Sequence, residues 1–244
     1  MLAIIGGTGL TQLANLDVSR RQVVRTPYGE PSGPLTFGSI RDVPVVFLAR
    51  HGYGHTIPPH QVNYRANLWA LKEQGISEIV SVVSVGGIRG DLGPGSIVVP
   101  HQIIDYTWGR MSTFFENEAP VKHIDFTQPY TPELRARILA AAAKSGEAAF
   151  DGAVYAATQG PRLETAAEIE RLQRDGADVV GMTGMPEATL AREIEIDYAA
   201  LAIVVNCAAG RGTSARAVPL AEIEEVLKGA LARARRIIEA LLTP

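Results

Sequence analysis

The sequence predicts an α/β fold in which a largely parallel or mixed sheet carries helices on both faces. Three observations predict this class. Short runs rich in β-branched residues alternate with longer helical patterns, several of these runs end directly in glycine, and the content of 46% hydrophobic and 20% charged residues is that of a globular protein. A chain of 244 residues can bury a sizeable core, and we expect a single domain over residues 1–244.

The first half of the chain contains one helical pattern between short apolar runs. Leu68, Trp69 and Leu71 have helical spacing within the stretch from Tyr64 to Gln74, and Gly75 follows as a stop signal. We therefore expect a helix there, and strands at Leu2–Ile5, Val43–Ala49 and Glu78–Val85.

The second half alternates strands and helices in the same way. We expect strands at Gly95–Pro100, Ala153–Thr158, Asp178–Gly181 and Asp197–Asn206, and helices at Thr131–Lys144, Glu164–Arg174, Pro186–Glu195 and Leu220–Leu242. Thr131 followed by Pro132 is typical of an N-cap with proline at the first helical position. The stretch Tyr106–Tyr130 is the least regular, and we interpret it as a surface loop or a partner contact.

Composition disfavours several classes of function. The net charge of −3 disfavours binding to nucleic acid, which usually needs a basic face. The single cysteine, Cys207, excludes an internal disulfide and a multi-thiolate metal site. The longest charge-free apolar stretch, Tyr198–Gly210, is too short to cross a membrane, and the first residues lack the basic segment of a signal peptide. We expect a cytoplasmic protein.

Glycine and polar residues are concentrated in six segments that follow expected strands. They are residues 6–10, 50–60, 84–90, 159–164, 182–187 and 206–212. Ligands of open α/β sheets bind beyond the carboxyl ends of the strands, so the six segments are expected to converge on one site.

The first segment, Gly6-Gly7-Thr8-Gly9, has two interpretations. Backbone N–H groups of such a loop can approach an anion, and Thr8 adds a hydroxyl donor. Alternatively, the loop is simply a tight turn. A dinucleotide-binding fingerprint fails because Gln12 stands where its third glycine is required.

Arg50 and His51 follow a strand and suit an anionic ligand, because the planar fork of arginine can bind two phosphate oxygens at once. A metal site involving His55 and His60 is disfavoured, since glycines and prolines prevent the helical spacing such a site uses. A structural role for these two histidines is the simpler interpretation. Asn206 ends an otherwise apolar strand, so its amide needs a partner.

Taken together, these segments resemble the trimeric family of purine nucleoside phosphorylases and methylthioadenosine phosphorylases. The matching stretches occur in family order and span nearly the whole chain: Ile4–Gly9, Ala49–Pro59, Val62–Asn67, Gly160–Thr165 and Gly181–Glu187. The resemblance implies a nucleoside phosphorylase fold with a mixed sheet partly closed into a barrel, and a homotrimer with sites at subunit boundaries. It implies inorganic phosphate as co-substrate, with no cofactor and no metal.

The resemblance also implies roles for individual residues. Phosphate would be bound by Thr8, Arg50, His51 and Thr183, with Val83 and Ser84 in the segment that joins them. The methylthioadenosine branch commonly has Thr-Ala at Val83-Ser84, which displaces the hydroxyl by one position. The nucleoside would contact Leu163, Met182, Asn206, Cys207 and Ala208, and His123 of a neighbouring subunit would approach its 5' end.

The base is expected to be a 6-oxopurine. Adenosine-type members of the family carry aspartates at the positions of Asn206 and Ala208 in this chain, and a small residue with a hydroxyl group at the position of Glu164. The Glu164 carboxylate can only accept, so it suits the N1–H of hypoxanthine and repels the N1 lone pair of adenine. The Asn206 amide can donate to O6 and accept from a protonated N7.

The 5' pocket is expected to be apolar. Members that cleave inosine and guanosine place a histidine near residues 217–220, whereas this chain offers Val218, Leu220 and Ile223, which suit a methylthio group. The combination predicts phosphorolysis of S-methyl-5'-thioinosine to hypoxanthine and 5-methylthioribose 1-phosphate. The alternatives are a methylthioadenosine phosphorylase, a general 6-oxopurine nucleoside phosphorylase, and a non-catalytic protein that binds purine nucleoside and phosphate.

Overall fold

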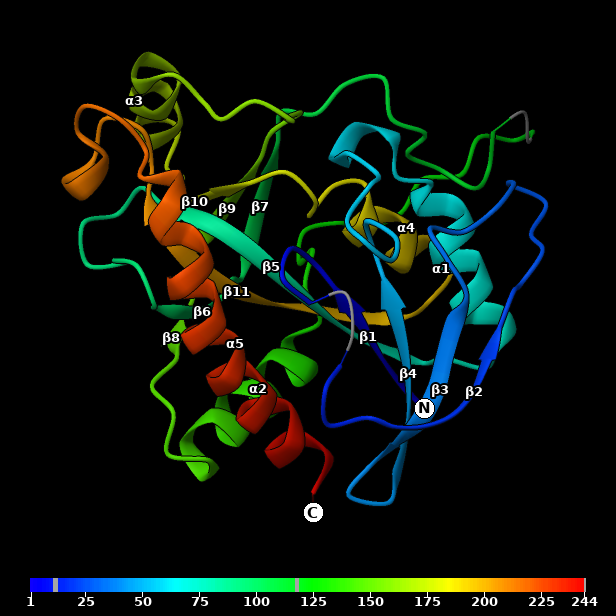
Figure 1. Cartoon of the computed structure of the whole chain (residues 1–244). Coiled ribbons are helices and arrows are strands. Elements are labelled where there is room, and N and C mark those ends of the chain that lie inside the picture. Colours follow the sequence, from blue (N-terminus) through cyan, green and yellow to red (C-terminus); the bar gives the residue numbers. More distant parts are fainter. Residues whose placement is uncertain (11–12, 117–118, 244) are drawn as a thin grey trace.

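A twisted mixed sheet runs through the centre of the computed structural model, and helices lie on both of its faces (Figure 1). The structure describes residues 1–10, 13–116 and 119–243. The strands are β1 Leu2–Gly6, β2 Asp17–Gln22, β3 Leu35–Ile40, β4 Val43–Ala49, β5 Glu78–Gly87, β6 Ile97–Val99, β7 Gln102–Asp105, β8 Phe150–Asp151, β9 Val154–Ala157, β10 Val179–Gly181 and β11 Asp197–Cys207. The helices are α1 Tyr64–Glu73, α2 Pro132–Lys144, α3 Ala166–Arg174, α4 Glu187–Glu193 and α5 Leu220–Leu242.

The two longest strands, β5 and β11, pair in parallel and form the middle of the sheet. On its other edge β5 pairs first with β1, up to Ser81, and then with β10, from Gly86 onward. The sheet therefore divides into one arm of β1, β4, β3 and β2 and a second arm of β10, β9 and β7. Residues 82–85 of β5 lie between the arms.

The sheet is mixed and branched. The pairs β1–β4, β1–β5 and β5–β11 are parallel, whereas β2–β3, β3–β4 and β5–β10 are antiparallel. β11 also pairs with β6, which pairs with β8. Across the described parts of the chain these pairings form no closed ring of strands.

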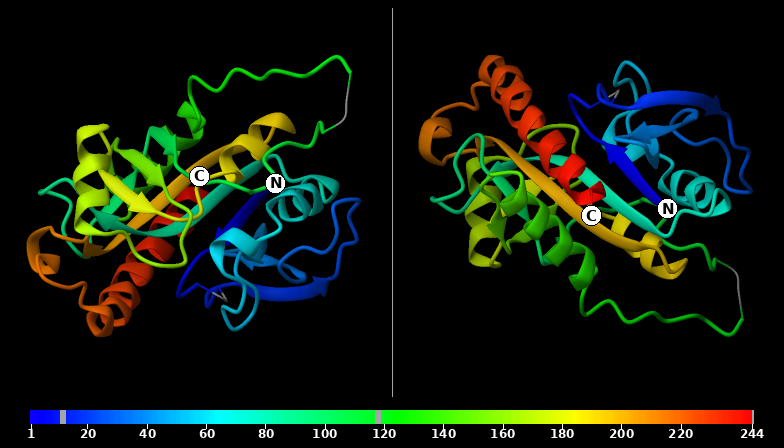
Figure 2. Two further views of the ribbon diagram at one scale, coloured as in Figure 1. Left: turned by 90° about the horizontal axis from the view of Figure 1, so that it is seen from above. Right: turned by 90° about the horizontal axis from the view of Figure 1, so that it is seen from below.

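The alternation of side chains explains how both faces of the sheet are buried. In β1, Ala3 and Ile5 join the apolar cluster that includes residues of α1 and α4, while Leu2 and Ile4 join the cluster that includes residues of α2 and α5. A smaller third cluster packs α3 against β9 and β10. Figure 2 shows the resulting layers from above and below. None of the described helices is long and apolar enough to cross a membrane.

The predicted α/β class and the predicted helices and strands are confirmed, with shifts of one or two residues at most ends. The sequence analysis missed β2, β3, β7 and the two-residue strand β8. β2 has the sequence DVSRRQ and is almost fully exposed, so it lacks the apolar pattern that indicates a strand. Thr131 is the N-cap residue of α2, but its hydroxyl donates to Asp197 instead of capping the helix.

Candidate functional site

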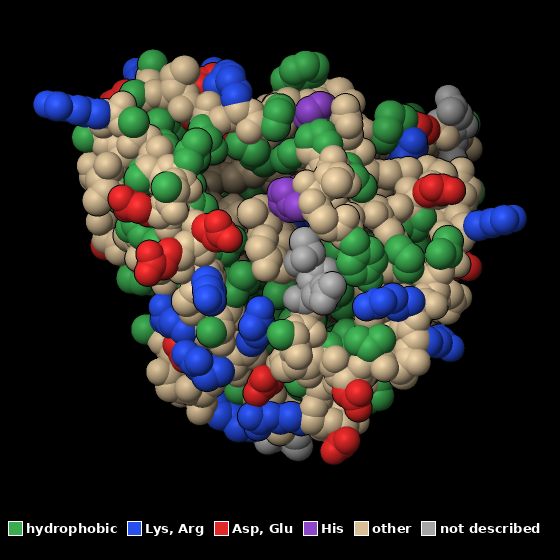
Figure 3. Space-filling view, viewed as in Figure 1, with side chains coloured by type: hydrophobic (Ala, Val, Ile, Leu, Met, Phe, Trp, Pro, Cys, Tyr) green, Lys and Arg blue, Asp and Glu red, His purple; other side chains and the backbone are tan. Residues whose placement is uncertain are grey.

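A cavity of about 420 Å³ opens where the two arms of the sheet separate. All six polar segments predicted to converge contribute to its lining, and residues 83–86 of β5 form part of its wall. Figure 3 shows the hollow in this face of the molecule, beside two histidine side chains. Its volume suits a small organic ligand.

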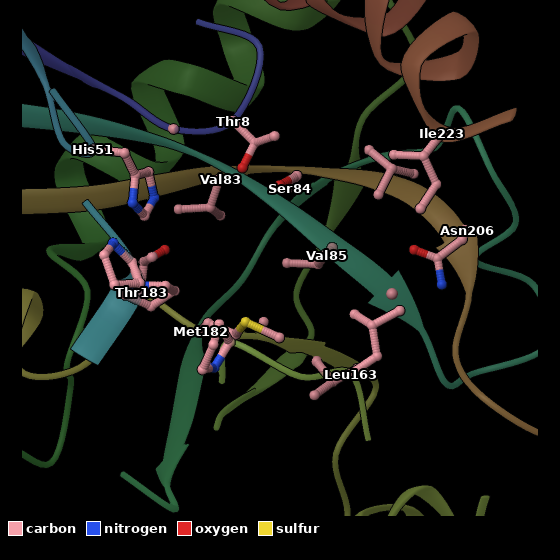
Figure 4. Close-up of a pocket in the computed structure, with 18 of the residues that line it drawn as sticks. Thr8, His51, Val83, Ser84, Val85, Leu163, Met182, Thr183, Asn206 and Ile223 are labelled. Atoms are coloured by element: carbon pink, nitrogen blue, oxygen red, sulfur yellow. The ribbon is translucent and has the colours of Figure 1, made fainter. Parts of the chain in front are cut away.

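Thirteen of the residues predicted for the site line this cavity. They are Thr8, Arg50, His51, Val83, Ser84, Leu163, Glu164, Met182, Thr183, Asn206, Ala208, Val218 and Ile223. In Figure 4, Thr8, His51 and Thr183 lie toward one end of the view and Asn206 lies at the other. These three residues, which are predicted to bind phosphate, are thus separate in this view from Asn206, which is predicted to contact the base.

Three predicted residues do not line the cavity. Cys207 ends β11 next to Asn206, but its sulfur lies beside Gly212. Leu220 begins α5 and is 67% exposed, so the apolar wall predicted from residues 218–223 consists here of Val218 and Ile223. His123 is exposed in the irregular segment between β7 and α2, and its role in a neighbouring subunit's site stays a prediction.

The glycine loop after β1 is a tight turn whose backbone also lies close to Arg50. Leu10 N donates to Gly7 O at 3.0 Å, and a Cβ on Gly7 would lie 2.7 Å from Val82 O and 3.1 Å from Arg50 Nη1. Only glycine fits there without moving the buried arginine or the strand. The two interpretations of this loop are therefore compatible, and Thr8 lines the cavity. Gln12, which argues against a dinucleotide fingerprint, lies outside the described residues.

Arg50 is fully buried and its fork is already occupied. Its Nε donates to Glu187 Oε2 at 2.7 Å, and its Nη2 donates to Glu187 Oε1 at 2.8 Å and to Ser81 Oγ at 2.6 Å. The prediction that the fork binds two phosphate oxygens is therefore wrong for this arrangement. Nη1, which contacts Val82 O at 3.4 Å, is the edge that remains for a ligand.

Glu187 is the partner that the sequence analysis did not identify. It begins α4, is fully buried, and also accepts from the hydroxyls of Ser81 and Tyr198, both at 2.8 Å. Burial alone would lower the pKa of Arg50 and raise that of Glu187. Their mutual attraction outweighs burial, so the pKa of Arg50 is raised and that of Glu187 is lowered. Both groups are charged. The signal in the sequence was an acid directly after Met185-Pro186.

His51 presents an unprotonated nitrogen. Its Nδ1 lies 2.8 Å from the carbonyl oxygen of Ile57, which can only accept, so Nδ1 carries the hydrogen. The pKa of His51 is lowered to about 4, mainly by burial and secondly by the positive charge of Arg50. The ring is therefore neutral near pH 7, and Nε2 is an acceptor. The sequence analysis predicted only that His51 suits an anionic ligand, and it did not identify this acceptor.

The neutral state of His51 predicts a loss of stability in acid. Its ordinary pKa of 6.5 falls to about 4 on folding, so between these values the unfolded chain binds more protons. The free energy of unfolding should decrease as the pH falls through this window. The side chain in His51→Asn keeps an N–H donor for the carbonyl oxygen of Ile57, but it has no group that gains a proton within this pH window. Chemical denaturation at neutral pH and midway through the window should show a smaller loss in His51→Asn than in the wild type. An equal loss of unfolding free energy in the two proteins would contradict the neutral state of His51.

At the other side of the cavity, Glu164 precedes the helix instead of opening it. α3 begins at Ala166, and Thr165 and Glu168 form a reciprocal capping box. Glu164 lines the cavity and accepts from Thr158 Oγ1 at 2.6 Å. The predicted start of this helix at Glu164 is thus two residues too early, and the Glu164 side chain is held by a hydrogen bond from Thr158.

Asn206 is oriented by its own backbone. Its Nδ2 donates to the carbonyl oxygen of Cys207 at 2.6 Å, which leaves one N–H and the amide oxygen for a ligand. In Figure 4, Asn206 lies at the right of the view, below Ile223. A Cβ on Gly160 would lie 2.4 Å from Met182 Sδ, so glycine is needed at this position for Met182 to keep its place.

Arg110 was also missed by the sequence analysis. It comes from the irregular segment after β7 and donates to the carbonyl oxygens of Thr158 and Gln159 in one loop. It also donates to the carbonyl oxygens of Met182 and Met185 in another. Both loops line the cavity or flank residues that do, so Arg110 fixes their relative position. Among residues 1–10, 13–116 and 119–243, no group of three or more His, Cys, Asp or Glu side chains is placed to hold a metal ion.

Known proteins resemble this chain over nearly its full length. The phosphorylase superfamily model matches residues 1–243. A relative from Pseudomonas syringae pv. tomato, named "probable S-methyl-5'-thioinosine phosphorylase", is 53% identical over 99% of this chain and 98% of its own. A 6-oxopurine nucleoside phosphorylase from Pyrococcus furiosus is 45% identical over 93% of this chain and 86% of its own.

A solved structure extends the similarity to the fold. Methylthioadenosine phosphorylase from Schistosoma mansoni, in complex with adenine, superposes with a TM-score of 0.93 at 32% identity, over 99% of this chain and 90% of its own. The similarity in sequence and in structure agrees with the resemblance found in the motifs, and the chain belongs to the phosphorylase superfamily.

Proposed function

We propose that this chain catalyses phosphorolysis of S-methyl-5'-thioinosine, giving hypoxanthine and 5-methylthioribose 1-phosphate. The observation that carries the proposal is the combination, in one cavity, of the Glu164 carboxylate with an apolar wall formed by Val218 and Ile223. The names of the relatives from Pseudomonas and Pyrococcus support a nucleoside phosphorylase that acts on 6-oxopurines.

Base recognition follows from donor and acceptor chemistry. One oxygen of Glu164 accepts from Thr158, and the other can accept from the N1–H of a 6-oxopurine. Adenine has a lone pair at N1, so a carboxylate there repels it. The free N–H of Asn206 can donate to O6, and its oxygen can accept from a protonated N7. A site built on such contacts discriminates strongly, because the wrong base leaves polar groups unpaired.

Phosphate would lie at the end of the cavity lined by Thr8, His51, Ser84 and Thr183. Arg50 would contribute Nη1, while its other nitrogens remain with Glu187 and Ser81. The unprotonated Nε2 of His51 would accept from a P–OH group, so it favours a protonated form of phosphate. Phosphate oxygen attacks C1' as the glycosidic bond breaks, and the bonding electrons pass to the purine.

The protein's contribution is positioning and electrostatic stabilisation. Asn206 stabilises the negative charge on the departing purine, and no covalent bond to the protein is formed. We further propose one domain over residues 1–244 working as a homotrimer in the cytoplasm, with no nucleic-acid or membrane partner. His123 of one subunit would then approach the 5' end of the nucleoside bound by its neighbour.

A parallel assay tests the proposal. The purified protein with phosphate is offered S-methyl-5'-thioinosine, methylthioadenosine and inosine, and the release of hypoxanthine or adenine is followed. We expect the highest kcat/KM for S-methyl-5'-thioinosine. Preference for methylthioadenosine, preference for inosine, or nucleoside binding without phosphate-dependent turnover would each replace the proposal by one of the alternatives.

A further inference from the structure

Glu164 stands in the wall between two cavities. One is the candidate site of about 420 Å³, and the other, of about 470 Å³, lies beside α3. Thr158, Arg162 and Arg171 line the second cavity together with Glu164. A glutamate side chain has several rotatable bonds, and the two guanidinium groups attract a carboxylate. Another contact must therefore decide which of the two cavities the Glu164 carboxylate faces.

Thr158 is placed to make that contact. It directly follows β9, and its backbone N donates to Gly181 O at 2.8 Å while its carbonyl accepts from Arg110. The residue is thus held by the sheet and by Arg110. Its hydroxyl lies 2.6 Å from Glu164 Oε1 and 3.2 Å from Gly181 O. A hydroxyl has one hydrogen, and the shorter distance, typical of a bond to an ionised acceptor, assigns that hydrogen to the carboxylate.

We propose that Thr158 is a specificity-determining positioning residue: its hydroxyl fixes one oxygen of Glu164 in the wall that the two cavities share, which leaves the other oxygen for the N1–H of a base in the candidate site. This inference rests on the proposed function. A fixed carboxylate discriminates between N1–H and an N1 lone pair, whereas a carboxylate that turns to the second cavity does not contact the base at all.

The arginines of the second cavity give the released carboxylate an alternative position. Arg162 pairs with Glu168 through both of its terminal nitrogens, and Arg171 lies 3.7 Å from Asp175. Both arginine side chains are more than half exposed, so water can solvate an additional carboxylate beside them. Without the Thr158 hydroxyl, the Glu164 side chain should populate two orientations, one facing each cavity.

The test compares Thr158→Val with Thr158→Ser. Valine has nearly the same shape as threonine but cannot donate, whereas serine keeps the donor. For Thr158→Val we expect kcat/KM for S-methyl-5'-thioinosine to fall about tenfold, as for loss of a hydrogen bond to a charged group. We expect kcat/KM for methylthioadenosine to stay constant or rise. Thr158→Ser should retain most of the wild-type ratio between the two substrates.

The ratio of the two substrates separates this role from a structural one. Equal losses on both substrates in Thr158→Val, or a Thr158→Ser ratio as low as that of Thr158→Val, would overturn the inference. Thermal unfolding of both variants checks that they fold. The proposed function is tested separately by the wild type: if the wild type prefers S-methyl-5'-thioinosine and Thr158→Val keeps that preference, only the inference about Thr158 fails.

Discussion

Glu187→Ala is expected to lower the free energy of unfolding by about 3–5 kcal/mol, because it leaves the buried Arg50 guanidinium without its counter-charge. The hydroxyls of Ser81 and Tyr198 lose the same acceptor. Urea denaturation of the variant and the wild type measures the difference. The same variant should lose nearly all phosphorolysis, since Arg50 no longer has a partner that fixes Nη1 at the cavity.

Glu133→Ala is the matched control. Glu133, like Glu187, follows a proline at the start of a helix, but it is exposed. Its replacement should change the free energy of unfolding by no more than about 0.5 kcal/mol. A double variant, Arg50→Met with Glu187→Met, removes both charges and should recover part of the stability lost in Glu187→Ala, without recovering activity. Equal effects of Glu187→Ala and Glu133→Ala would contradict the buried ion pair.

Much of the site could be predicted because strand ends have clear local signals. The runs that became β4, β5 and β11 are apolar and stop at a charged residue, at glycine or at a polar amide. The end of such a run can be recognised from the neighbouring sequence alone. Asn206 is the best example: an amide that ends a buried strand requires a partner, and it lies at the cavity.

The orientation of side chains could not be predicted in the same way. The partner of Arg50 lies 137 residues away, so the sequence indicated a guanidinium but not which of its edges faces the ligand. The tautomer of His51 depends on the carbonyl of Ile57, which a single turn brings within reach. Arg110 lies in a segment without regular structure, and most of its partners are backbone oxygens, which have no signature in the sequence.

In helix α5 the local sequence pattern predicted the range of the helix but not the orientation of its first residue. Its predicted range, Leu220–Leu242, is confirmed, and Val218 and Ile223 line the cavity. Leu220 was assigned to the same wall because it is apolar, yet it points to solvent. Hydrophobicity predicts that a residue of a helix prefers burial, but which residues of the first turn face the cavity depends on how the helix enters the fold.

The substitution Glu164→Gln is expected to reduce kcat/KM for S-methyl-5'-thioinosine by about 10²-fold, as for loss of a charge-assisted hydrogen bond to N1–H. The carboxamide can turn its N–H toward the N1 lone pair of adenine, so kcat/KM for methylthioadenosine should stay constant or increase. The ratio of the two values is the measurement. Glutamine matches glutamate in size, and thermal unfolding should show little change.

Asn206→Asp is the companion variant at the base. An aspartate anion cannot donate to O6, and its charge disfavours the negative charge that develops on a departing 6-oxopurine. We expect it to erode the preference for S-methyl-5'-thioinosine as well. Under the proposed function Glu164 contacts N1, and Asn206 contacts O6 and N7, so the two substitutions would remove different contacts of the same base. An unchanged substrate ratio in both variants would contradict this account of base recognition, even if phosphate-dependent cleavage persisted in each.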